Sequence, residues 1–162
     1  MPERVVIANT SPLLYLHQVG HLDLLRVLYK LVIVPPAVRV ELQAGVKARI
    51  AVPDLAAFSW IEIRTVQSQL LIPAIVDLGP GEAEVIGLGL EHPGSLLILD
   101  DQLARRVAAL NHLAFTGTLG VVLKAKQSGC LAAAGPVLER LRSSGLWLRD
   151  DLVAAALRRA GE

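Results

Sequence analysis

Short apolar runs alternate with longer segments of helical spacing along the chain, and this alternation is the strongest constraint on its fold. Three of the runs, residues 5–8, 31–34 and 96–99, contain no polar side chain. Strands that are apolar on both faces are typical of parallel sheets covered by helices on both sides. We therefore predict a three-layer α/β/α fold around a mostly parallel five-stranded sheet, with the first and fourth strands adjacent.

The rest of the pattern completes this alternation. Two further strands are predicted at residues 60–66, where apolar and polar residues alternate, and at residues 113–116. Proline at a first helical position and glycine after a last one mark helix ends, so Pro36 is expected to begin a helix that Gly45 ends. Other helices are expected after Pro12, from Pro80 to about Leu90, from Asp100-Asp101 to about Leu110, and at 119–127, 136–143 and 150–159. Because there is neither a linker nor a repeat, we predict one domain spanning residues 1–162.

Composition limits where such a chain can work. Cys130 is the only cysteine, which excludes an internal disulfide and fits a reducing cytoplasm; its apolar neighbours predict a buried side chain. The mean hydropathy is +0.51, but no apolar run approaches the ~20 residues of a membrane span. The apolar run that ends before Asn9 has only four residues, too few for a signal peptide. We therefore expect a cytoplasmic protein without membrane contact. The high apolar content also favours a homodimer.

Polar side chains gather where the predicted strands end. Asn9, Thr10 and Ser11 follow the first strand, Asp100 and Asp101 the fourth, and a T-G-T segment that begins at Thr116 the fifth. Ligands of open α/β sheets bind beyond the carboxyl ends of the strands, where the strand order reverses. Adjacent carboxylates repel one another, so a helix cap explains one of the two aspartates but not both.

Two glutamates are further candidates, each with a structural alternative. Glu82 falls in the first turn of its helix, where the helix dipole alone favours a negative charge. Glu41 lies beside an apolar stripe of its helix, from which its carboxylate can reach solvent. Other chemistries lack their motifs: there is no phosphate-binding G-x-x-x-x-G-K-[ST] loop, no G-x-S-x-G elbow, and no third ligand for zinc beside His17 and His21.

Five motifs, in order and with compatible spacing, resemble the PIN-domain nuclease superfamily, and most closely a VapC-like prokaryotic branch of it. They are N-T-S-P-L from Asn9, P-x-x-V-x-x-E-L ending at residue 42, G-P-G-E-A-E from residue 79, residues 96–105 in the place of the family's L-L-x-D-D-x-x-A-R, and T-G-T-x-G from Thr116. The resemblance covers nearly the whole chain and implies a PIN-like fold. It also implies hydrolysis of RNA phosphodiesters with Mg²⁺ or Mn²⁺, which three or four acidic residues hold.

The resemblance assigns roles by position. Glu41, Glu82 and Asp100 or Asp101 match family acids that hold the metal and orient water, whereas the family's first aspartate is Asn9 here. An amide oxygen can bind a hard cation but adds no charge, so weaker metal binding is expected. Asn9, Thr10, Ser11 and Thr116 would complete the site or contact substrate, and Arg105 and Arg106 would hold flanking phosphates.

Three functions follow from these assignments. The first is a metal-dependent ribonuclease, the toxin of a pair whose partner is a small antitoxin protein. The second is a PIN-fold protein weakened in catalysis by Asn9 that binds nucleic acid or is regulated by a partner. The third, a phosphoacceptor or phosphatase-like α/β domain, ranks last, because such domains carry an aspartate after the first strand, where this chain has asparagine.

Overall fold

A computed structural model describes residues 4–162; residues 1–3, which the domain and signal-peptide predictions include, lie outside the described part. The described chain forms a sheet of five strands, all paired in parallel in the order β3-β2-β1-β4-β5. The strands are β1 (Val6–Ala8), β2 (Val32–Val34), β3 (Ile61–Ile63), β4 (Leu96–Ile98) and β5 (Ala114–Thr116). The predicted parallel sheet and the adjacency of the first and fourth strands are confirmed.

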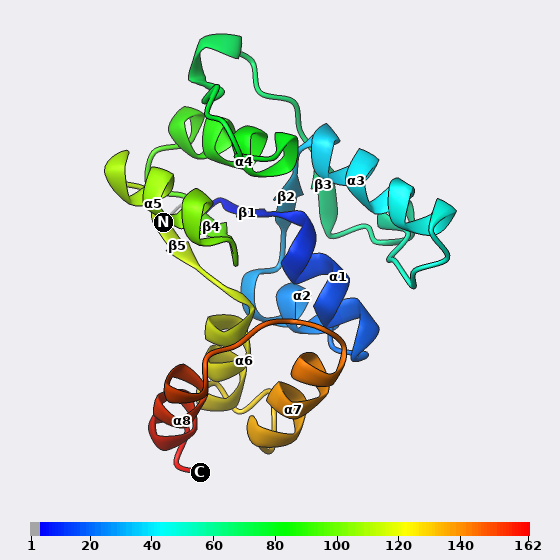
Figure 1. Ribbon diagram of the computed structural model, residues 1–162, viewed down its shortest axis with the longest axis vertical. Helices are drawn as coiled ribbons and strands as arrows, with labels where there is room; N and C mark the ends of the chain where they lie inside the picture. The colour runs from blue at the N-terminus through cyan, green and yellow to red at the C-terminus, as the bar shows by residue number, and fades with distance from the viewer. Residues whose placement is uncertain (1–3) are drawn as a thin grey trace.

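Helices cover both faces of this sheet (Figure 1). On one face α4 (Pro80–Glu91) packs against β1 and β4 and beside α5 (Gln102–Leu110). On the other, α2 (Asp23–Tyr29) packs against β2 and α6 (Thr118–Gln127), and α6 also contacts α1 (Thr10–Gln18). The helix α3 (Pro36–Lys47) touches both α1 and α4, while α7 (Gly135–Ser143) and α8 (Asp150–Arg159) pack against α6. Two 3-10 turns, η1 (Leu55–Ala57) and η2 (Gln69–Leu71), lie on either side of β3 along the chain.

The strand order places a crevice between β1 and β4. From β1 the chain moves outward through β2 to β3, and it then crosses back to add β4 and β5 on the other side of β1. The connections that leave β1 and β4 therefore diverge to opposite faces of the sheet. Ligand sites of open α/β sheets lie at such a reversal of strand order.

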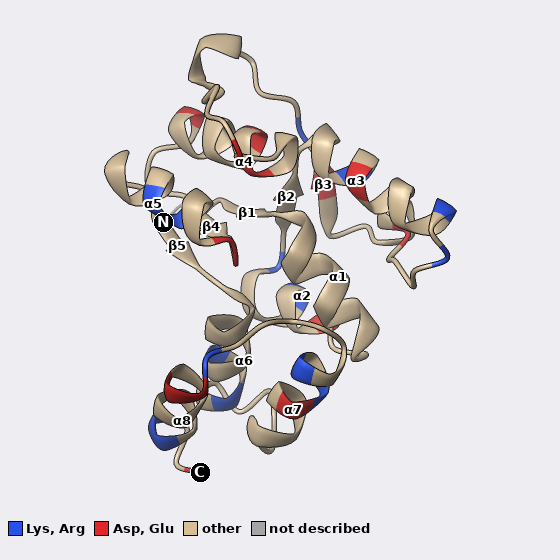
Figure 2. Cartoon of the chain, viewed as in Figure 1, with Lys and Arg blue, Asp and Glu red and all other residues tan. Residues whose placement is uncertain are grey.

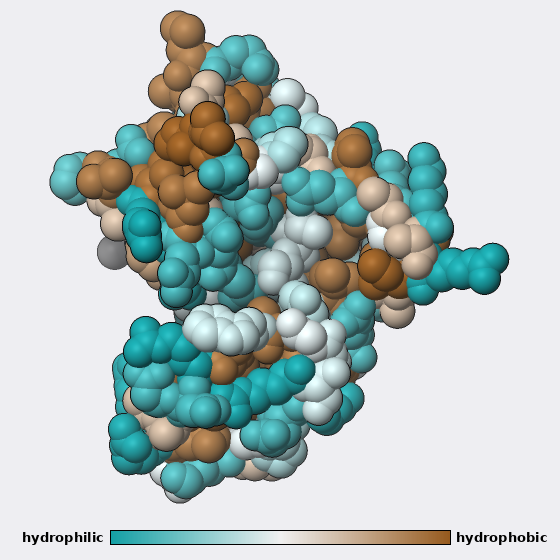
Figure 3. All heavy atoms as spheres, in the orientation of Figure 1, coloured by the Kyte–Doolittle hydropathy of each residue, from teal (hydrophilic) through white to brown (hydrophobic). Residues whose placement is uncertain are grey.

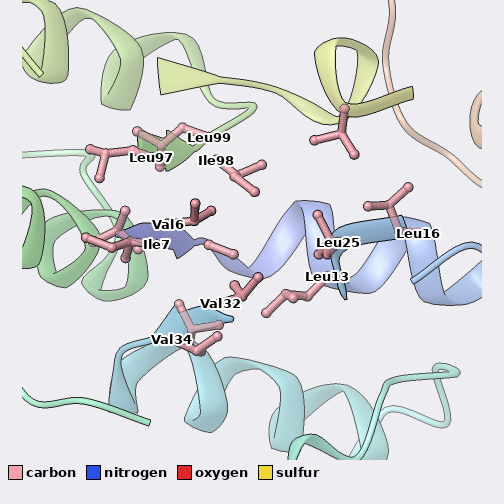
Figure 4. Packing of buried hydrophobic residues seen from close by; sticks show 14 of the residues in the cluster. Val6, Ile7, Leu13, Leu16, Leu25, Val32, Val34, Leu97, Ile98 and Leu99 are labelled. Carbon is pink, nitrogen blue, oxygen red and sulfur yellow. The ribbon is translucent and has the colours of Figure 1, made fainter. Parts of the chain in front are cut away.

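The core explains why the central strands are apolar on both faces. Ile7 of β1 pairs with Ile33 of β2 and with Leu97 of β4, and all three side chains are buried. Figure 4 shows side chains from these strands packed against Leu13, Leu16 and Leu25 of the helices. Burying each such side chain contributes roughly 1.5–3 kcal/mol, so the core holds the ends of β1 and β4 in a fixed register.

Two local predictions are wrong. Helix α3 does not end at Gly45 but continues to Lys47, because Gly45 faces the following loop: a Cβ there would lie 2.7 Å from Cγ1 of Val52. Gly45 therefore allows a close approach and does not end the helix. Cys130 is exposed in the turn after α6 and does not belong to the core. None of the helices in residues 4–162 is long and apolar enough to cross a membrane.

Candidate functional site

Asn9 and Asp100 meet at the carboxyl ends of β1 and β4. The backbone N–H of Asn9 donates to the carbonyl of Ile98 at 3.1 Å, which continues the pairing of the two strands by one residue. Asn9 precedes α1, but its side chain makes no capping hydrogen bond to that helix. The side chain is 3% exposed, and Oδ1 is a buried polar atom without a hydrogen-bond partner within residues 4–162. An unpaired buried oxygen is rare and points to a ligand that the protein itself does not supply.

Asp100 is held by three donors. Its carboxylate accepts hydrogen bonds from Oγ of Ser11 at 2.9 Å, from the backbone N–H of Thr118 at 2.8 Å and from Oγ1 of Thr118 at 2.7 Å. Thr118 is the first residue of α6, so the dipole of that helix also favours a negative charge here. These donors fix the position of the Asp100 carboxylate, which faces the crevice.

Asp101 has a different role, although it is the next residue. Its carboxylate accepts a hydrogen bond from the backbone N–H of Ala104 at 2.9 Å and caps the N-terminus of α5. Asp101 is therefore explained as a helix cap. Asp100 is the aspartate that still needs a functional explanation.

Glu41 approaches Asn9 from α3. Its carboxylate accepts hydrogen bonds from the hydroxyl of Thr10 and, at 2.9 Å, from the backbone N–H of Gly81 in the first turn of α4. A Cβ at residue 81 would lie 2.7 and 2.8 Å from the two carboxylate oxygens of Glu41 and 2.9 Å from Oδ1 of Asn9. Both side chains therefore converge on one spot that only glycine leaves open.

Two acids of α4 act differently. Glu82 folds back over Gly79 at the start of α4, and its side chain faces the same groove as Asn9 and Asp100. Glu84 accepts a hydrogen bond from the backbone N–H of Ala37 at 2.8 Å and so supports the N-terminus of α3. Glu84 and Glu41 thus tie the first turns of α3 and α4 to each other, which the sequence pattern did not indicate.

The structure places the remaining predicted residues around these acids or away from them. Thr116 lies against Gly120 in the next helix, and Thr118 of the same motif is the residue that reaches Asp100. Arg105 donates from Nε to the carbonyl of Leu99 at 2.8 Å and stacks over Phe115, with 5.4 Å from its Cζ to the ring centroid. Arg106 is exposed on α5. Neither arginine lines the groove.

The groove itself has a volume of about 750 Å³. Its charged lining is acidic, as Figure 2 shows for the end of β4 and the start of α4, while Lys and Arg gather on α6, α7 and α8. Three residues of its far wall, which carried no signal in the sequence, come from the segment between α7 and α8. The lining residues are Asn9, Ser11, Tyr15, Glu82, Asp100, Asp101, Gln102, Gly145, Leu146 and Trp147.

The donor set of this site fits a hard divalent cation. Within residues 4–162 no three His, Cys, Asp or Glu side chains converge as a metal-binding group, so the four predicted acids do not form one cluster. The amide oxygen of Asn9, however, is buried, unpaired and close to the Glu41 carboxylate, and Asp100 and Glu82 face the same groove. Carboxylate and amide oxygens are the ligands that Mg²⁺ and Mn²⁺ prefer.

Comparison with known proteins identifies the family of this chain. A search among curated proteins found no match to the chain. A family model, DUF3368, described as a PIN domain, matches residues 5–162 and so spans every strand of the sheet and every residue of the groove. The chain therefore belongs to the PIN-domain nuclease superfamily.

Proposed function

We propose that this protein is a ribonuclease that depends on Mg²⁺ or Mn²⁺ and hydrolyses RNA phosphodiesters. PIN domains are generally nucleases, so family membership supports nuclease-type chemistry. The observation that carries the metal dependence is the buried, unpaired Oδ1 of Asn9, which lies beside the carboxylate of Glu41 and in one groove with Asp100. A bound cation would satisfy that oxygen, whereas no hydrogen-bond donor of residues 4–162 does.

Each residue of the site has a distinct task in this proposal. Oδ1 of Asn9 and the carboxylate of Glu41 would hold the cation, and Asp100 and Glu82 would add negative charge from the same groove. The cation would lower the pKa of a bound water and stabilise charge on the phosphate. Ser11 and Thr118 hold the Asp100 carboxylate in its orientation by donating hydrogen bonds to it. Thr10 and the backbone N–H of Gly81 do the same for Glu41. Asp101 stays outside the chemistry as a helix cap.

The two adjacent aspartates make a matched test. Asp100→Asn should reduce cleavage of a labelled structured RNA by about 100-fold or more, because it removes a charge from the metal site. Asp101→Asn should keep both activity and stability, because asparagine caps helices as well as aspartate does. Calorimetric titration with Mn²⁺ should show weaker binding for Asp100→Asn only. Equal activity of the two variants, or cleavage that persists in EDTA, would contradict the proposal.

A second function is favoured by Asn9 itself. With an amide in place of the family's first aspartate, the site carries one negative charge fewer, and all three donors at Asp100 come from the protein. A protein that binds RNA without cutting it, or whose activity a partner regulates, would then retain RNA in Mg²⁺ without turnover. RNA retention and cleavage measured on the same sample separate the two functions.

The cellular role that we propose is that of a toxin in a toxin–antitoxin pair. The family resemblance supports it, and the partner would be a small antitoxin protein encoded by a neighbouring reading frame. Expression of the chain alone should then arrest growth, and co-expression of the neighbour should restore it. Growth arrest by the Asp100→Asn variant as well would show that the arrest does not depend on nuclease activity.

A further inference from the structure

Trp147 is a large aromatic side chain exposed on the rim of the acidic groove. It lies between α7 and α8, in a segment that crosses between these helices and the rest of the molecule (Figure 1). It is one of only two tryptophans in the chain. Its exposed fraction is 73%, whereas tryptophan is usually well covered. An aromatic side chain kept in water at the mouth of a groove suggests a ligand that covers it.

The segment that carries Trp147 is held in place on both sides. Gly145 adopts a positive φ of 108°, and its N–H donates to the carbonyl of Arg142 at 3.0 Å. The next side chain, Leu146, is buried, and its N–H donates to the carbonyl of Leu141 at 3.1 Å. On the far side, Nη2 of Arg142 donates to the carbonyl of Leu148 at 2.8 Å. Since Leu146 points inward, Trp147 is directed outward by a fixed backbone.

Trp147 shares its groove with the residues of the proposed metal site. The same space of about 750 Å³ is lined by Trp147 and Tyr15 and also by Asp100, Glu82 and Asn9. Cavities of roughly 300–1,000 Å³ hold small ligands, so a single nucleotide unit is of suitable size. A nucleotide combines a phosphate, which suits the metal site, with a flat aromatic base, which suits an indole ring.

The surroundings of Trp147 favour a base over an apolar protein surface. On its outer side lie Arg142 and Arg149, each paired with an aspartate: Arg142 with Asp150 at 2.7 Å and Arg149 with Asp151 at 2.6 Å. These pairs surround the indole ring with polar groups, and they leave little net positive charge for phosphates. Stacking on the ring is therefore the main attraction that this wall offers.

We propose that Trp147 is a stacking platform for one base of single-stranded RNA, next to the phosphate that is cleaved. This inference rests on the proposed ribonuclease function and names its substrate as unpaired RNA, because a base inside a duplex cannot expose its face to the ring. Stacking on an aromatic side chain tolerates any base, so Trp147 contributes affinity and strand selection without a strict sequence preference.

The test uses the fluorescence of Trp147 itself. Trp60→Phe removes the only other tryptophan, which packs against Phe58 with ring centroids 5.5 Å apart, so Trp147 becomes the sole indole emitter. Single-stranded RNA of about ten nucleotides, added in Mg²⁺, should quench this emission. An oligonucleotide of equal length and charge without bases should quench it much less. Equal quenching by the two probes would overturn the proposal.

Affinity gives the second readout. Trp147→Ala should weaken binding of the RNA between about 5-fold and 150-fold, the range expected for losing one stacked base, and Trp147→Phe should restore most of it. Leu70→Ala, which removes an apolar side chain that is 95% exposed outside this groove, is the control and should bind as the unaltered protein does. Unchanged affinity of Trp147→Ala would overturn the proposal. Loss of self-association in that variant, with RNA binding intact, would assign the residue to a protein interface and overturn it as well.

The outcomes also separate this inference from the proposed function. A gel run after each titration shows whether the oligonucleotide is intact, so binding and cleavage are scored independently. Quenching by RNA that is never cut would leave the stacking platform standing and contradict the ribonuclease. Cleavage that requires Asp100 but does not change with Trp147→Ala, together with unaltered affinity, would support the ribonuclease and refute the platform.

Discussion

Replacing Asn9 with aspartate is the sharpest test of the site, because it adds charge to a buried position beside Glu41. An ideal Cβ at Gly81 lies 2.9 Å from Oδ1 of Asn9 and 2.7 Å from the nearer oxygen of Glu41. Those two oxygens are therefore no more than about 5.6 Å apart. Two unit charges at that separation repel by about 3 kcal/mol when the effective dielectric constant is about 20.

We therefore expect Asn9→Asp to lower the free energy of unfolding by about 3 kcal/mol at neutral pH in EDTA. A divalent cation should reverse this loss, since a ligand at about 100 times its dissociation constant stabilises the folded state by about 2.7 kcal/mol. Urea denaturation in EDTA and in excess MnCl₂ measures both effects, and calorimetry should show tighter Mn²⁺ binding by the variant. Nuclease activity should rise with metal occupancy.

Gln43→Glu is the matched control, because it adds the same charge at an exposed position of α3. Its stability should stay within about 0.5 kcal/mol of the unaltered protein in either buffer. If Asn9→Asp is as stable in EDTA as the unaltered protein, the charges do not converge as described. If the loss persists in excess metal, the site does not bind a divalent cation.

Two further predictions concern pH and assembly. Burial, and secondarily the charge of Arg140, lower the pKa of His21, so protonation is disfavoured in the folded state. The free energy of unfolding should therefore fall as the pH drops below about 6.5. In urea titrations between about pH 7.5 and 5, His21→Asn should show a smaller decline, because it lacks the contribution of His21. An equal decline in both proteins would contradict this. Val76 and Leu110 are 85% and 80% exposed, and apolar atoms gather over the α4 and α5 side of the molecule (Figure 3). We expect a homodimer in light scattering at micromolar concentration that Leu110→Asp converts to a monomer; monomeric behaviour of the unaltered protein would refute it.

The sheet was predictable because burial on both faces leaves a direct mark on the residues. Strands β1, β2 and β4 are central, and their apolar runs follow from that position. Asn9 and Asp100 follow two of these strands, so their meeting at the crevice follows from parallel pairing alone. The weaker predictions concerned helix ends, where Gly45 serves loop packing rather than termination.

Contacts between elements that are far apart in the chain could not be predicted from the sequence pattern. Asp100 and Asp101 are chemically identical neighbours, and only the direction in which each side chain leaves the backbone makes one a cap and the other a site acid. Thr118 reaches Asp100 because α6 begins there, which a T-G-T motif alone does not reveal. Trp147 joins the groove through the packing of α7 and α8 on α6, far from every motif.

The reciprocal hydrogen bonds between α3 and α4 have a consequence for how this chain tolerates change. Glu41 accepts a hydrogen bond from a residue 40 positions later in the chain, and Glu84 accepts one from a residue 47 positions earlier. These two bonds fasten α3 to α4 beside Asn9. The length of the chain between α3 and α4 therefore does not determine the distance between these two helices. Doubling the length of an exposed turn there would add only about 0.6 kcal/mol of closure entropy. An exposed turn of this stretch can therefore be lengthened by engineering while the groove keeps its shape.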